Sequence, residues 1–343
     1  MTRTLLLSSS FLLLFILGSA HAGSPPLFPE GVGSNLVFHE LGAYASNASI
    51  ENWEKDVKVT LLHYHEKQDE VRARLKAMRA GGQSKISLVL WYIQEGGKGA
   101  YFSHVICPQN GKIPDQIESN IRNVLKDIST AGYDTVVMRM AAQGLADPLS
   151  ETYQPARALD SWKLFESLHA ACESAIEGTK LKVLYDLGAE TMGHPYSIRP
   201  GAQAFLKLMW SNYSKKYPAS KTVGFSFNHA YDPATRESLR IYEDSGVWPA
   251  AISVDIYEDP DRFLGNLSRA LTTFGKGGHP LIINETYRNN KDMAKAFAIN
   301  QRKLGLNFRF LLQWPLDKGA AGHSNGPLTT DIGAYTDPIE LNE

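Results

Sequence analysis

Eight short apolar runs, separated by segments with helical periodicity, constrain the fold of this 343-residue chain more than any other feature. The runs are rich in β-branched and aromatic residues and comprise positions 36–38, 86–93, 135–140, 181–185, 223–227, 251–256, 281–283 and 308–312. Short apolar runs that lack polar alternation are typical of strands buried on both faces of a parallel sheet.

The segments between these runs have the spacing of amphipathic helices. One such face precedes Gly132 and consists of Ile117, Ile121, Val124, Leu125 and Ile128. Another ends at Gly305, and a third follows Asp160 and Ser161, which are candidate helix N-caps. A strand followed by a helix, repeated eight times, predicts an α/β fold, the closed (β/α)8 TIM barrel. An open doubly wound sheet is the alternative, but no glycine-rich phosphate loop follows a first strand to support it.

The first strand has two candidates, because residues 57–62 form a ninth strand-like run. We assign the first strand to residues 36–38, since the later strands then follow at regular spacing. Residues 57–62 are the alternative first strand, in which case residues 36–38 would form a hairpin or a plug at the bottom of the barrel.

The N-terminus has the pattern of a secretory signal peptide. Arg3 supplies the positive charge, residues 5–17 are mostly apolar, and Ala20-His21-Ala22 fits the small-x-small cleavage rule. We therefore expect cleavage after Ala22 and a secreted or periplasmic protein, with an uncleaved membrane anchor as the alternative. No later stretch is apolar enough to span a bilayer.

The remaining residues, 23–343, are predicted to form a single barrel domain with its core at about 36–318 and a C-terminal extension. A formal net charge of −1 argues against nucleic-acid binding, and we expect a monomer. The chain has two cysteines, Cys107 and Cys172. Export would permit a disulfide between them, and the sequence leaves that pairing open.

Polar and aromatic residues follow the predicted strands, at the end where a parallel barrel gathers its functional side chains. They include Trp91, Arg139, Glu190, Asn228, Tyr257, Asn284, Glu285 and Trp314. This composition predicts a mouth that is rich in carboxylates and has aromatic walls. Such a mouth suits a carbohydrate, whose C–H faces stack on aromatic rings while its hydroxyl groups bond to carboxylates and amides.

Glu190 and Glu285 follow the fourth and seventh strands, which lie opposite each other in an eight-stranded barrel. Hydrolysis of a glycosidic bond needs two carboxyl groups that flank the bond, one to protonate the leaving oxygen and one to attack or to activate water. The two glutamates are therefore the candidate catalytic pair.

The segments KVLYDLGAET and LIINETY resemble strands four and seven of the clan A glycoside hydrolases. This resemblance covers roughly residues 36–317 as a pattern of strand ends. It implies a retaining mechanism with Glu190 as the acid/base and Glu285 as the nucleophile, and it implies neither a cofactor nor a metal. By the same resemblance Trp314 is the aromatic residue of the eighth strand, and Tyr257 is placed to hydrogen-bond the nucleophile.

Six residues are predicted to bind and orient the substrate: Arg139, Asn228, Tyr257, Trp314, Trp91 and Asn284. One departure from the clan pattern is Ala189, which stands where an asparagine normally contacts the sugar 2-hydroxyl. The departure implies an altered substrate, a replacement by Asn228 or Asn284, or a loss of catalysis. The long connection at residues 94–113 is predicted to form a rim or lid over the cleft.

Two other functions remain open. A non-catalytic glycan-binding barrel would keep the aromatic residues of the mouth and tolerate Ala189. A metal-dependent hydrolase of the amidohydrolase type is suggested by the pair His63-x-His65, with His229 and Asp317 as further ligands. The sequence favours an exported retaining glycoside hydrolase acting on a poly- or oligosaccharide, and it leaves the sugar, the linkage and endo or exo action undetermined.

Overall fold

The computed structural model describes residues 26–41, 57–94, 105–108, 110–315, 318 and 330–339. The predicted signal peptide, most of the predicted lid, and Asp317 lie outside the described residues. Among the helices that are described, none is long and apolar enough to cross a membrane.

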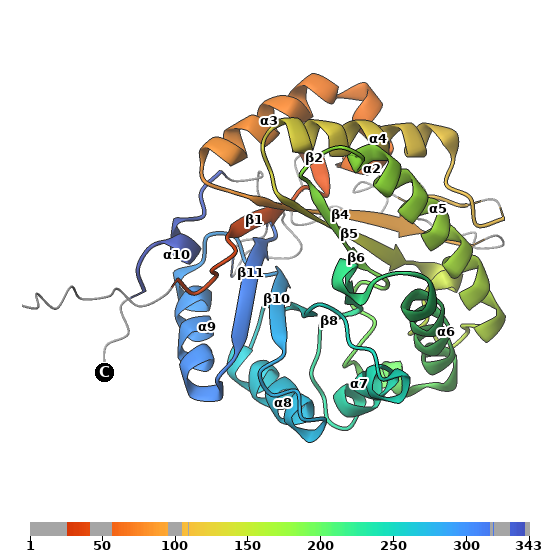
Figure 1. The fold of residues 1–343 in the computed structure, drawn as a ribbon, viewed down its shortest axis with the longest axis vertical. Coiled ribbons are helices and arrows are strands. Elements are labelled where there is room, and N and C mark those ends of the chain that lie inside the picture. Colours follow the sequence, from red (N-terminus) through yellow and green to blue (C-terminus); the bar gives the residue numbers. More distant parts are fainter. Residues whose placement is uncertain are drawn as a thin grey trace, which may run out of the picture.

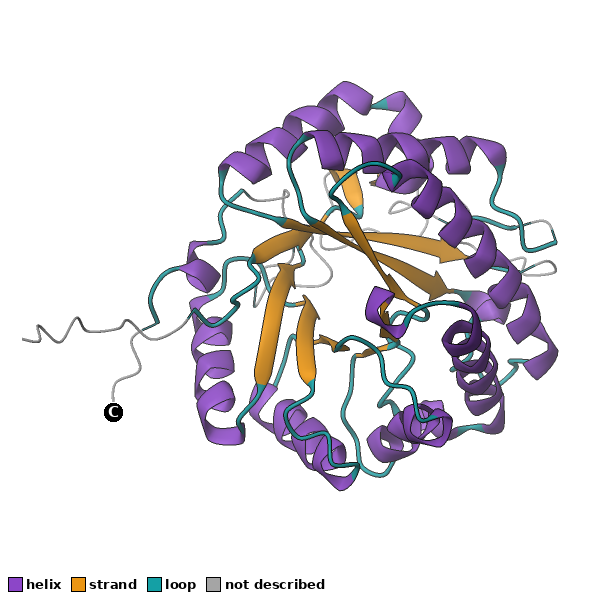
Figure 2. Ribbon diagram, viewed as in Figure 1, coloured by secondary structure: helices purple, strands orange, loops and turns teal. Residues whose placement is uncertain are grey.

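Parallel strands form one sheet that curls into a nearly closed barrel, and the helices lie outside this ring (Figures 1 and 2). The order in the sheet is β7-β6-β5-β4-β1-β11-β10-β9-β8. The strands are β1 Val32–Asn35, β4 Lys85–Tyr92, β5 Thr135–Ala142, β6 Lys182–Asp186, β7 Thr222–Gly224, β8 Ser226–Phe227, β9 Ile252–Asp255, β10 Pro280–Glu285 and β11 Asn307–Gln313. The prediction of a (β/α)8 TIM barrel is therefore confirmed.

The helices follow the strands in the predicted alternation. They are α2 Thr60–His63, α3 Gln68–Ala80, α4 Asp115–Thr130, α5 Ala158–Ile176, α6 Pro200–Lys216, α7 Ala234–Ser245, α8 Pro260–Thr273, α9 Lys291–Leu304 and α10 Gly333–Thr336. The predicted face of α4 is buried, and α9 ends at Gly305 in the left-handed conformation. The predicted caps Asp160 and Ser161 are wrong, because α5 begins at Ala158 and contains both residues.

The prediction for the first strand is also wrong. The strand that closes the barrel is β1, four residues upstream of the predicted run, and it pairs with both β11 and β4. Residues 38–41 form β2, which pairs antiparallel with β3 (Val57–Val59) outside the barrel sheet. The first strand is small and polar because its neighbours are close. A Cβ on Gly33 would lie 1.8 Å from the backbone oxygen of Lys85.

The predicted fifth strand is split into β7 and β8 at Phe225. Gly224 at the break has φ +69, and a Cβ there would lie 2.1 Å from the Tyr242 hydroxyl oxygen. A residue with a side chain would therefore be strained by both its backbone angle and its neighbour. The barrel's ring of hydrogen-bonded strands is interrupted at this point, and the chain itself bridges the gap.

Seven buried apolar side chains fill the barrel interior below the mouth: Val137, Leu184, Val223, Ala251, Ile282, Phe310 and Leu312. A larger apolar layer lies between the sheet and the helices. Above the interior layer the inward-facing residues become polar, beginning with Arg139, Asp186 and Asp255, all of which are buried. Cys107 and Cys172 are both free, so the open question of a disulfide is answered in the negative.

Candidate active site

Arg139 lies at the centre of the barrel mouth, on β5, with no exposed side-chain surface. Its Nε donates to Asp186 Oδ2 at 3.0 Å, and its Nη2 donates to Asp255 Oδ2 at 2.6 Å and to Ser226 Oγ at 3.0 Å. Its Nη1 donates to Glu285 Oε1. A guanidinium group offers five donors in a fixed plane, so this one side chain fixes the positions of three carboxyl groups.

Glu285 is the last residue of β10, and an irregularity in the strand sets its direction. The register between β10 and β9 shifts between Ile283 and Glu285. Such a bulge re-aims a side chain, and here the carboxylate enters the mouth while the preceding apolar residues remain buried. Besides Arg139, the Tyr257 hydroxyl donates to Glu285 Oε2 at 2.7 Å.

Glu190 lies in the loop after β6 and has an unusual backbone conformation. Its φ is +58, in the left-handed region that non-glycine residues seldom adopt, and its backbone N–H donates to Ser226 Oγ at 2.7 Å. Strain of this kind costs roughly 1–3 kcal/mol and is often found at functional sites. Burial, followed by the negative charge of Glu285, raises the pKa of Glu190 to about 7.

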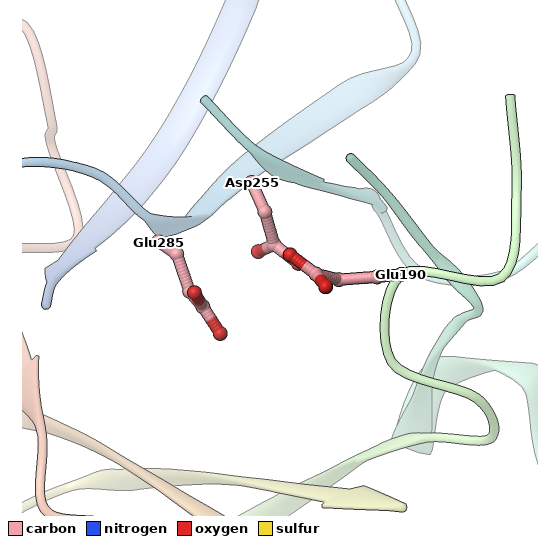
Figure 3. Close-up of side chains that lie close together, drawn as sticks. All are labelled: Glu190, Asp255 and Glu285. Carbon is pink, nitrogen blue, oxygen red and sulfur yellow. The ribbon is translucent and has the colours of Figure 1, made fainter. Parts of the chain in front are cut away.

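Glu190 and Glu285 face each other across the mouth, with Asp255 beside them (Figure 3). One carboxylate oxygen from each of the three residues lies within 4.8 Å of the others. Retaining glycosidases hold their two carboxyl groups about 5–5.5 Å apart, whereas inverting enzymes need about 6.5–9.5 Å to admit a water molecule. One oxygen of Glu190 and one of Glu285 thus lie closer together than the carboxyl groups of an inverting enzyme.

The mouth holds more carboxyl groups than positive charges. Burial raises the pKa of Asp186, and it raises the pKa of Asp255 well above its usual value, with the charge of Glu285 adding to the second shift. The cluster therefore retains protons at pH values where exposed carboxyl groups have lost them. One carboxylate and one carboxylic acid can then coexist in the same site.

The three acidic residues could in principle hold a metal ion, because their oxygens converge. Asp255 and Glu285 already accept hydrogen bonds from Arg139, however, so its guanidinium group already supplies positive charge to two of the three carboxyl groups. The donor set is thus better suited to a guanidinium group than to a divalent cation.

Two cavities open at the mouth and meet at Glu190 and Asn228, which line both. The first cavity has a volume of about 290 Å³ and is lined by Glu285, Arg139, Trp91 and Trp314 among others. The second has a volume of about 330 Å³, and its lining comes from the loops after β8 and β9 and from α8 (Asn228, His229, Ala230, Tyr231, Asp255, Ile256, Tyr257, Glu258, Asp259, Arg262, Phe263 and Asn266, with Glu190).

The structure brings seven of the eight predicted site residues to this mouth, namely Glu190, Glu285, Arg139, Asn228, Tyr257, Trp314 and Trp91. The exception is Asn284, which is fully buried and lines neither of these cavities. Asn284 lies at the register shift between Ile283 and Glu285, and it is buried without access to either cavity.

Of the residues proposed for the metal-dependent alternative, His63 and His65 are described by the structure and do not lie at the barrel mouth. His63 is the last residue of α2, and His65 lies in the following 3₁₀ turn, Tyr64–Glu66, rather than on a barrel strand. His65 Nδ1 lies 3.2 Å from Asn120 Nδ2 on α4, in the outer layer of helices. The two histidines are thus structural neighbours of α4.

Sequence reasoning missed several residues of the mouth. Gln143 and Asp147, in the loop after β5, line the first cavity, and burial raises the pKa of Asp147. Tyr231, which the sequence did not single out, lines the second cavity together with His229, a residue at the end of the predicted fifth strand. A signal was present, because the short pattern His-x-Tyr occurs twice, at residues 194–196 and 229–231.

No protein-family model and no curated protein matches the sequence, but solved structures match the fold. An endo-β-1,4-glucanase from Xanthomonas axonopodis pv. citri has a TM-score of 0.52 at 12% identity, over 90% of this chain and 96% of that chain. A broad-specificity endoglucanase of GH5-4 from Ruminococcus flavefaciens has a TM-score of 0.52 at 13% identity, over 90% and 93%.

A third similar structure is a GH5_18 protein from Bifidobacterium longum subsp. longum, with a TM-score of 0.54 at 11% identity, over 89% of this chain and 77% of that chain. These likenesses establish that the chain has the (β/α)8 barrel found in family 5 glycoside hydrolases.

Proposed function

We propose that this protein is an exported glycoside hydrolase that cleaves a poly- or oligosaccharide with retention of configuration. The observation that carries the proposal is the pair Glu190 and Glu285. One oxygen of each lies within 4.8 Å of the other, and burial together with the charge of Glu285 raises the pKa of Glu190 to about 7. A carboxyl group that keeps its proton near neutral pH, close to a second carboxyl group, is what general-acid catalysis in such a pair requires.

In the first step the Glu285 carboxylate attacks the anomeric carbon while Glu190 gives its proton to the departing glycosidic oxygen. The product is a glycosyl ester of Glu285 and a free leaving sugar. Glu190, now ionised, then removes a proton from water, which attacks the same carbon and releases Glu285. Arg139 and Tyr257 orient Glu285 for both steps through their hydrogen bonds to its two oxygens.

Asn228 is the candidate replacement for the asparagine that Ala189 lacks. It lines both cavities, and its side chain hydrogen-bonds Glu190. Asn284 is too deeply buried for that role. We therefore assign Asn228, Trp91 and Trp314 to substrate binding. Export rests on residues 1–22 and is tested by sequencing the N-terminus of the mature protein.

The decisive experiment is incubation with a panel of activated 2-fluoro glycosides, followed by intact-protein mass measurement and peptide mapping. The expected result is a stable adduct on Glu285. A Glu285→Gln variant should form none, and Glu237→Gln, which changes a partly exposed glutamate of α7, should react like the wild type. An adduct on another residue, or none on folded protein with any sugar, would reject the proposal.

The second candidate is a glycan-binding barrel without catalysis, and Ala189 is the observation that favours it. Ala189 lines the cavity that holds Glu285, so a contact expected of the clan is missing at the reacting centre. The two functions differ in one measurement. Binding of β-1,4-linked gluco- or manno-oligosaccharides without hydrolysis, and without an adduct, would favour the binding protein.

A further inference from the structure

Two loops at the edge of the mouth carry four aromatic rings that pack in a row. His194 and Tyr196 lie at the start of the 3₁₀ turn Pro195–Ile198 after β6, and His229 and Tyr231 follow β8. The ring centroids of Tyr196 and His194 are 4.4 Å apart, those of His194 and His229 are 4.8 Å apart, and those of His229 and Tyr231 are 5.1 Å apart. We call these four rings the aromatic row.

Gly193 allows the two loops to meet. It has φ +77, and a Cβ there would lie 1.8 Å from the backbone oxygen of His229. The backbone N–H of Tyr231 donates to the Gly193 oxygen at 3.2 Å. The row is therefore fixed by backbone contacts, and its rings do not depend on a ligand for their arrangement.

The row is exposed where a structural cluster would be buried. Tyr196 is 45% exposed and Tyr231 is 39% exposed, which makes them two of the few large apolar side chains on the described surface. Burial lowers the pKa of His194 and His229, and this favours the neutral imidazoles that stack best on an uncharged partner. An exposed, preorganised aromatic surface of this kind marks a binding site.

The charges at the ends of the row are already paired. The Arg199 guanidinium lies 3.7 Å from the Tyr196 ring centroid and also bonds Glu151 at 2.9 Å. Arg262 lies 6.0 Å from the Tyr231 ring centroid and pairs with Asp259 at 3.0 Å. No strong positive surplus is left for an anionic ligand, so an uncharged ligand with flat C–H faces fits the surface better.

The positions of the two cavities indicate which part of the substrate lies next to the aromatic row. Glu285 lines only the first cavity, so the sugar whose anomeric carbon it attacks must lie there. Glu190 lies at the junction, where the scissile oxygen must be. The leaving part of the substrate therefore occupies the second cavity, which His229 and Tyr231 line.

We propose that the aromatic row binds the leaving-group side of an uncharged oligosaccharide, one or more sugar units beyond the unit that departs from Glu190. The protein would then cut within a chain rather than remove single terminal units. This inference rests on the proposed function and adds to it the mode of attack.

The test uses two kinds of substrate. Dinitrophenyl glycosides end at the leaving group, whereas β-1,4-linked gluco- and manno-oligosaccharides of increasing length extend past it. The quantity measured is the ratio of kcat/KM for a long oligosaccharide to kcat/KM for the aryl glycoside of the same sugar. In the double variant Tyr196→Ala/Tyr231→Ala we expect this ratio to fall about tenfold, which corresponds to about 1.4 kcal/mol of transition-state binding, because the variant removes two exposed rings of the row.

Two control variants and the pattern of products test whether a fall in the ratio is caused by loss of the aromatic row. Ile299→Ala, a change of similar exposure on α9, should keep the wild-type ratio, and Tyr231→Trp alone should also keep it because a flat ring remains. Reducing-end-labelled substrates should be cut at internal bonds by the wild type.

An unchanged ratio in the double variant, or release of single terminal units only, would overturn the inference while a Glu285 adduct upheld the proposed function. Absence of both the adduct and any hydrolysis would reject the two together.

Discussion

Replacing Arg139 with methionine tests whether this one cation holds the buried carboxyl groups of the mouth. The side chain of Asp186 is fully buried and accepts from Arg139 Nε at 3.0 Å. Without the guanidinium, Asp186 must either remain charged in a poorly solvated site or take up a proton. Removing one partner from a buried ion pair typically costs about 3–5 kcal/mol.

The free energy lost by leaving Asp186 unpaired cannot exceed the free energy needed to protonate it. That protonation free energy depends on pH. Protonating a carboxyl group of ordinary pKa costs up to about 4 kcal/mol at pH 7 and up to about 1.5 kcal/mol at pH 5. In Arg139→Met the folded-state pKa of Asp186 is raised further above its unfolded value, so the folded variant binds an additional proton. Its stability relative to the wild type therefore rises as pH falls. We expect the difference in unfolding free energy to shrink by about 2–3 kcal/mol between pH 7 and pH 5.

Urea denaturation of the two proteins at both pH values measures this difference. Arg79→Met is the matched control, because Arg79 is exposed and its Nε donates only to the Gly132 backbone oxygen at 3.0 Å among the contacts described for it. Adding Asp186→Asn to Arg139→Met should recover much of the loss at pH 7. If Arg139→Met loses the same free energy at pH 5 and pH 7, the reasoning from buried charge is refuted and packing is the cause.

Three further predictions concern the reaction and the loops. The wild type should lose kcat/KM as pH rises through about 7, because the acid Glu190 loses its proton there, and Glu190→Gln should lack this limb with a dinitrophenyl glycoside. Tyr257→Phe removes the 2.7 Å hydrogen bond to Glu285 and should lower kcat/KM about ten- to a hundredfold with unchanged thermal stability. Gly193→Ala should destabilise the fold by about 1–3 kcal/mol, and by more than Gly178→Ala, which has a similar positive φ but open space around it.

The architecture could be predicted from the sequence because most of its strands are continuous apolar runs. Strand β1 could not, since Gly33, Ser34 and Asn35 resemble a loop. Asn35 is buried because its Nδ2 donates to the backbone oxygens of Asn284 at 2.9 Å and Gln313 at 3.3 Å. Those partners are distant in sequence, so the residues around Asn35 do not predict these hydrogen bonds.

The candidate catalytic pair was predictable from the positions of Glu190 and Glu285 at strand ends, but their surroundings were not. Asn284 was misjudged because strand periodicity does not reveal a bulge, and the bulge decides which of two neighbouring polar residues faces the mouth. The aromatic row was missed for a different reason. A single His-x-Tyr pattern in a loop does not indicate a binding surface. The two copies form one surface only because Gly193 allows their loops to lie in contact, and the sequence does not reveal that contact.

The break between β7 and β8 lies in the part of the barrel wall where strand pairing is shortest. The ladder between β4 and β5 pairs residues along both strands, from Lys85 with Thr135 to Tyr92 with Ala142. On either side of the break, β6 with β7 and β8 with β9 pair at two positions each. In the proposed assignment the reacting sugar lies against the extensively paired strands, whereas the departing fragment lies on loops that follow the sparsely paired ones. We therefore expect local opening to be easier around the departing fragment than around the reacting sugar.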